Sequence, residues 1–108
     1  MKTYQIGPDV PYDLDCIGTE GRQWLVHWYE HETGGYDGYG FAAALRDDGL
    51  IEWANLGHCS CYGPTDGWPK EGKTVEEFIS ANTSNHALDH STGVDMVVAK
   101  VKELLGLK

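Results

Sequence analysis

The chain has 108 residues, of which 41% are hydrophobic and 23% charged, and its formal net charge is −9. This composition is typical of a globular protein with a single core and unlike that of a disordered chain. Residues 3–69 contain eleven acidic and only two basic side chains, so the clustered Lys and Arg that a phosphate backbone requires are missing and direct nucleic-acid binding is not expected. An acidic surface favours cationic partners, or serves solubility alone.

The sequence also argues against export and membrane insertion. The first nine residues have no apolar stretch of the kind found in signal peptides, and the longest apolar run, Phe41–Leu45, is too short to span a bilayer. Three cysteines, two of them only two residues apart, do not suit a secreted disulfide framework. We therefore expect a cytoplasmic protein with no membrane partner.

The first half of the chain predicts strands joined by turns. Glycines and prolines in residues 1–22 predict an irregular lead-in. Trp24–Glu30 is the first convincing strand, and since both of its faces are partly apolar we expect it to be covered on both sides. The sequence Asp47-Asp48-Gly49 predicts a hairpin turn between strands at Tyr39–Arg46 and Leu50–Leu56.

The second half predicts helices. Thr74-Val75-Glu76-Glu77 matches a capping box, in which Glu77 lies three residues after the Thr74 cap. Asn82–His90 is polar and predicts a loop. A weaker cap at Thr92 precedes apolar residues with helical spacing, and Gly106 suits the position just past the helix end. The apolar residues with helical spacing are Val94, Val97, Val98, Val101, Leu104 and Leu105.

Together these elements predict an α+β fold, a three- to four-stranded antiparallel meander with C-terminal helices packed on one face. We expect a single domain over residues 1–108. It would consist of the lead-in over 1–22, the sheet over 23–62 and the helical part over 74–106.

The segment His58-Cys59-Ser60-Cys61 carries the richest chemistry. If it continues the preceding strand, Cys59 and Cys61 point to one face, where two thiolates could bind zinc. Cys59, Cys61, His58 and Cys16 are the candidate ligands, although Cys-x-Cys is not the usual zinc knuckle. Both cysteines could instead be small buried core residues. A third interpretation makes one of them a nucleophile with His58 or His27 as its base, without an identifiable orienting group or oxyanion hole.

The segment Gly34–Gly40 is rich in glycine and tyrosine and joins two strands. No helix follows it, so it is not a phosphate-binding loop. Its tyrosines could simply pack on the sheet. Alternatively, Tyr36 and Tyr39 could stack, together with Trp68, on a planar ligand.

Two runs, Tyr36–Phe41 and Gly57–Pro64, carry a resemblance to known proteins. The second run, Gly-His-Cys-Ser-Cys-Tyr-Gly-Pro, resembles the core of small uncharacterised proteins encoded by tailed bacteriophages and prophages. The resemblance covers about residues 24–68 and implies an accessory protein acting in a bacterial host cytoplasm. It implies no catalytic residue, because that group has no activity to carry over.

The sequence therefore favours a non-enzymatic phage accessory protein that docks a host protein or sequesters a small ligand. The expected contacts lie on the glycine-aromatic hairpin and the segment that follows it: Tyr36, Asp37, Tyr39, His58, Tyr62 and Trp68. The alternatives are a small cysteine-dependent enzyme, a zinc-stabilised interaction module and an acidic inhibitor that mimics DNA.

Overall fold

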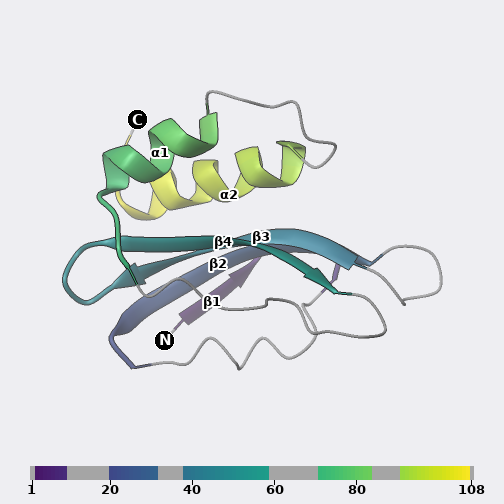
Figure 1. Cartoon of the computed structure of the whole chain (residues 1–108), viewed down its shortest axis with the longest axis horizontal. Coiled ribbons are helices and arrows are strands. Elements are labelled where there is room, and N and C mark those ends of the chain that lie inside the picture. Colours follow the sequence, from purple (N-terminus) through teal and green to yellow (C-terminus); the bar gives the residue numbers. More distant parts are fainter. Residues whose placement is uncertain (1, 10–19, 32–37, 59–70, 84–90, 108) are drawn as a thin grey trace.

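The structure is a four-stranded sheet with two helices on one face (Figure 1). It is a computed structural model and describes residues 2–9, 20–31, 38–58, 71–83 and 91–107. The predicted α+β class is confirmed, and neither helix is long and apolar enough to cross a membrane. The elements are β1 (Lys2–Gln5), β2 (Arg22–His31), β3 (Gly38–Arg46), β4 (Ile51–His58), α1 (Val75–Thr83) and α2 (Ser91–Leu104).

Strands β2, β3 and β4 form the predicted antiparallel meander. The β3–β4 hairpin turns at Asp47-Asp48-Gly49, where Gly49 has φ of 87°. Only glycine takes this conformation without strain. The Asp48 carboxylate accepts a hydrogen bond of 3.0 Å from the Leu50 backbone N–H, which closes the turn.

Strand β1 was not predicted. It lies at the edge of the sheet, parallel to β2, with Lys2 opposite Trp24 and Gln5 opposite His27. The expected irregular lead-in therefore contains a strand, and the sheet is mixed rather than wholly antiparallel. A parallel pair needs no adjacent turn, so the four residues Lys2–Gln5 carry no hairpin signal in the sequence.

The face of the sheet under the helices holds the larger core. Trp24, Val26 and Trp28 line β2 on this face, as their alternation predicted. Phe78 of α1 lies with its ring centroid 5.3 Å from that of Trp53 and 6.4 Å from that of Phe41. Burying each of the two phenylalanine side chains, which are almost fully enclosed, contributes about 1.5–3 kcal/mol to folding. Helix α2 adds Val94, Val97, Val98 and Val101.

The opposite face of the sheet is buried as well, as expected for a strand covered on both sides. A second apolar cluster there contains Leu25, Tyr29, Ala42, Ala44 and Leu56. The neighbouring β2 position on this face is His27, which is also buried. We call this side of the sheet the second face.

Helix α1 begins at the predicted capping box. The Thr74 hydroxyl oxygen accepts a hydrogen bond of 3.1 Å from the Glu77 backbone N–H, and the Glu77 carboxylate accepts from the Thr74 hydroxyl at 3.1 Å. This arrangement satisfies donors that the first turn of a helix leaves without partners.

Replacing Thr74 with alanine is therefore expected to lower the free energy of unfolding by about 1 kcal/mol. Urea denaturation followed by circular dichroism would measure the loss. Thr74→Ser keeps the accepting hydroxyl and should retain most of the stability, so equal losses in the two variants would contradict the capping role.

Helix α2 differs slightly from its prediction at the start. It begins at Ser91, so Thr92 lies inside the helix and is not its cap. The end agrees, because Gly106 has φ of 72° and the Leu107 N–H donates to the Lys102 carbonyl at 2.8 Å. This is the glycine-terminated helix end that the sequence indicated.

Candidate functional site

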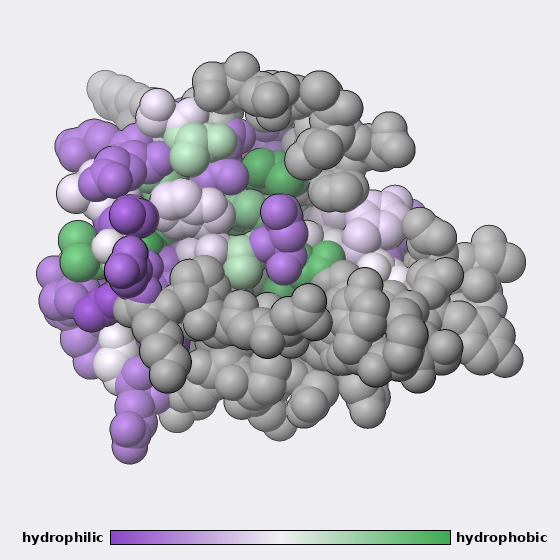
Figure 2. Space-filling model, in the orientation of Figure 1, coloured by the Kyte–Doolittle hydropathy of each residue, from purple (hydrophilic) through white to green (hydrophobic). Residues whose placement is uncertain are grey.

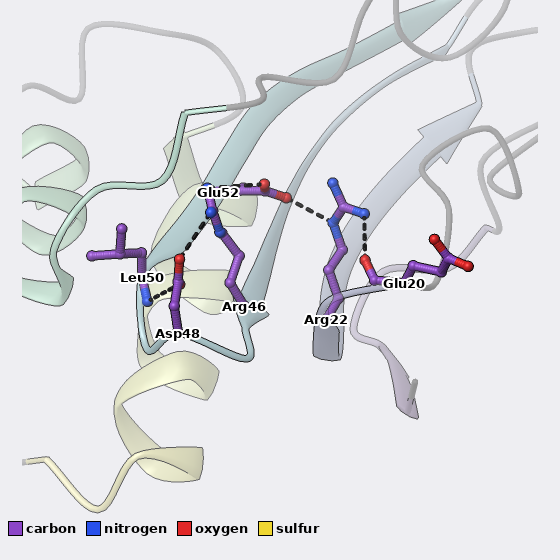
Figure 3. A network of polar contacts seen from close by, with 6 residues as sticks. All are labelled: Glu20, Arg22, Arg46, Asp48, Leu50 and Glu52. Carbon is purple, nitrogen blue, oxygen red and sulfur yellow. Dashed lines mark hydrogen bonds and ion pairs between the residues drawn. The ribbon is translucent and has the colours of Figure 1, made fainter.

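A buried carboxylate organises the hairpin end of the sheet. Glu52 lies on β4, in register with Ala44 on the second face, and is only 4% exposed. A buried carboxylate is costly unless cations and hydrogen-bond donors surround it. Two arginines meet this need: Arg22 Nε lies 2.7 Å from Glu52 Oε1, and Arg46 Nη1 lies 3.8 Å from Glu52 Oε2 (Figure 3).

A β-bulge brings Arg22 into this cluster. The register of β2 against β3 shifts between Arg22 and Trp24, so that Gln23 is an extra residue and Arg22 pairs with Arg46. Without the shift, alternation would place Arg22 on the helix-covered face with Trp24. The bulge instead directs Arg22 toward Glu52.

Both arginines also bind groups beside the hairpin. Arg46 Nη2 lies 2.8 Å from Asp48 Oδ2 in the turn, and Arg22 Nη1 donates to the Glu20 backbone carbonyl at 3.4 Å (Figure 3). Gly72 lies against Arg46, since a Cβ on Gly72 would come within 2.9 Å of Arg46 Nη1. The cluster thus holds β2, β3, β4 and the segment before α1 together, and it uses both positive charges internally.

The cluster lines a hollow of about 340 Å³. The lining residues are Glu20, Gly21, Arg22, Arg46, Asp47, Asp48 and Glu52, which give four acidic and two basic side chains, a net charge of −2. Of the acidic side chains, Glu20, Asp47 and Asp48 are exposed.

More acidic side chains reach this end of the molecule through the segment before α1. Ile51 and Lys73 exchange backbone hydrogen bonds of 2.7 and 2.8 Å, which place the start of α1 beside the hairpin. Figure 2 shows hydrophilic residues gathered on the left of the molecule, where the β3–β4 hairpin lies in Figure 1. We define the acidic hairpin end as six exposed side chains: Glu20, Asp47, Asp48, Glu71, Glu76 and Glu77.

Among the residues of the predicted aromatic surface, the structure describes the side chain of Tyr39. Its ring centroid lies 5.5 Å from that of Trp28, and its hydroxyl donates to the Glu30 carboxylate at 3.3 Å. Tyr39 thus packs at the margin of the larger core, which agrees with the interpretation that tyrosines of this hairpin pack on the sheet. In the backbone pairing of β3 with β4, Tyr39 is opposite Gly57 and His58 is opposite Gly38.

The other predicted site residues lie outside the described ranges: Cys16, Tyr36, Asp37, Cys59, Cys61, Tyr62 and Trp68. The zinc site and the cysteine nucleophile therefore stay predictions. Within the described ranges, no group of three or more His, Cys, Asp or Glu side chains is arranged to hold a metal ion.

His27, considered above as a catalytic base, is 2% exposed on the second face. Burial lowers the pKa of its imidazole below the ordinary value of 6.5, since removal from water penalises the charged form. Its Nδ1 atom is buried and makes no hydrogen bond with any described residue.

The Arg22–Glu52–Arg46 cluster was not recognised from the sequence. One signal was available, because Arg22 and Arg46 are the only basic residues between positions 3 and 69. Two isolated cations in an acidic stretch indicate specific carboxylate partners.

Comparisons with protein-family models, with curated proteins and with solved structures find no match for this chain.

Proposed function

We propose that this chain is a non-enzymatic binding protein that docks a partner protein through its acidic hairpin end. The contact surface of the partner would carry Lys or Arg side chains. The proposal keeps the expected class of protein, a phage accessory factor that docks a host protein in the host cytoplasm, but moves the contact surface from the glycine-aromatic hairpin to the acidic hairpin end.

One observation carries the proposal: Arg22 is paired with Glu52, and Arg46 with Glu52 and Asp48, while Glu20 and Asp47 beside them are exposed. These ion pairs direct the two guanidinium groups toward Glu52 and Asp48, and among the described residues neither guanidinium forms an ion pair with the carboxylate of Glu20 or Asp47. The exposed Lys73 lies 4.0 Å from the Glu71 carboxylate and offsets one of the acidic charges. Acidic side chains still outnumber basic ones at this end, and the negative potential would steer a basic partner toward it and favour its orientation. The hollow beside Asp47 offers a concave contact for a long basic side chain.

A fluorescein-labelled hexalysine peptide provides a defined basic probe, with binding followed by fluorescence anisotropy at low salt. Asp47→Lys is expected to weaken binding about fivefold, since reversing one exposed charge changes the interaction by about 1 kcal/mol. Asp47 is an exposed turn residue, so the variant should fold normally.

Asp95→Lys is the matched control. Asp95 is exposed on α2, away from the hollow, and the substitution changes the net charge by the same amount. If both variants weaken binding equally, the peptide responds to the total charge of the protein and the acidic hairpin end is not the docking surface. If neither variant changes the affinity, the proposed site is wrong.

A further inference from the structure

Among the described residues of the second face, the histidine His27 lies between apolar neighbours. His27 is 2% exposed, and its neighbours along β2 on this face are Leu25 and Tyr29. Ala42 lies opposite it on β3. A neutral imidazole fits such a site at modest cost, whereas an imidazolium would be a buried charge.

No described carboxylate lies opposite His27 in the sheet. In the sheet, His27 pairs with the uncharged Gln5 on β1 and with Ala42 on β3. Ala42 in turn pairs with Ala54 on β4.

Two described carboxylates belong to residues one row away along β2. Glu52 lies in the row of Leu25 and is bound to Arg22 and Arg46. Asp9 lies beside Tyr29, whose carbonyl accepts a hydrogen bond of 3.1 Å from the Asp9 backbone N–H.

We propose that His27 is an acid-sensitive element of the fold: its imidazole gains a proton only when the second face opens, so acid favours the unfolded chain. In the folded protein burial keeps the pKa of His27 below 6.5, while the unfolded chain protonates this side chain near 6.5. Stability is therefore unaffected well above 6.5 and falls as the pH drops below that value, because the unfolded state then binds the extra proton. The loss continues until the pH reaches the lowered pKa of the folded state.

Urea denaturation of the whole chain at about pH 7.5 and about pH 5.5 tests this proposal, since carboxylates stay largely ionised in that window. In the wild-type protein, lowering the pH from about 7.5 to about 5.5 is expected to raise the unfolding equilibrium constant by up to about tenfold, because His27 takes up a proton in the unfolded chain. His27→Gln and His27→Leu should remove this part of the pH dependence. His90→Gln, which removes a histidine elsewhere in the chain, serves as the control and should retain it.

An unchanged pH dependence in both His27 variants would overturn the proposal. A second measurement does not depend on any variant: NMR titration of the His27 ring protons in the folded wild-type protein. The proposal expects no titration near pH 6.5, whereas an ordinary titration at that pH would contradict it. Neither outcome bears on docking at the acidic hairpin end, so the two proposals can fail separately.

Discussion

Replacing Glu52 with methionine is expected to lower the free energy of unfolding by about 3 kcal/mol. Glu52 is the buried carboxylate shared by Arg22 and Arg46. Removing it leaves the guanidinium of Arg22, only 15% exposed, without its 2.7 Å partner in a poorly hydrated position. Urea denaturation at neutral pH, with tryptophan fluorescence as the signal, would measure the loss.

Two further variants separate the buried pair from ordinary surface pairing. Asp48→Asn weakens the more exposed Arg46–Asp48 pair but keeps an oxygen for the Leu50 N–H, and should cost at most about 1 kcal/mol. The double variant Arg22→Met/Glu52→Met removes both charges and should be more stable than Glu52→Met alone. A Glu52→Met loss no larger than that of Asp48→Asn would contradict the organising role of Glu52.

Replacing Gly93 with alanine is expected to destabilise the protein by about 2–3 kcal/mol, although alanine is the better helix former by about 1 kcal/mol. The first turn of α2 rests on the indole of Trp28, and a Cβ on Gly93 would lie 2.3 Å from two ring atoms. Helix α2 would have to move away from β2, which would disturb the packing of Val94 and Val97. The thermal unfolding midpoint and urea denaturation would both report this loss.

A second substitution tests the steric explanation. Trp28→Phe reduces the ring beneath Gly93, so Gly93→Ala should cost less in the Trp28→Phe protein than in the wild type. An unchanged cost would mean that the clash with Trp28 is not the cause. Stabilisation of the wild-type protein by Gly93→Ala would show that helix propensity outweighs this contact.

Local sequence signals predicted the parts of the fold that depend on neighbouring residues. Asp47-Asp48-Gly49 marked the hairpin because Gly49 must take positive φ, and Thr74 with Glu77 marked the start of α1. Alternation of apolar residues in β2 assigned Trp24, Val26 and Trp28 to one face. In each case the physical cause lies within a few residues of its effect.

Contacts between distant residues could not be predicted in this way. Strand β1 forms only because β2 accepts it as a parallel neighbour, and its four residues have no turn signal of their own. The bulge at Gln23 depends on the pairing of β2 with β3, and it is this bulge that directs Arg22 to Glu52, thirty residues away. The acidic hairpin end therefore follows from tertiary structure and not from a sequence motif.

Chemical-shift mapping tests the proposed docking surface most directly. Labelled wild-type protein would be titrated with the hexalysine peptide, and the backbone amide signals followed by NMR. We predict the largest shifts at Gly21, at Arg46–Gly49 and in the segment 71–77, with a response that disappears at high salt. Shifts concentrated on β1 or on the exposed side of α2, or the absence of any localised shift, would contradict docking through the acidic hairpin end.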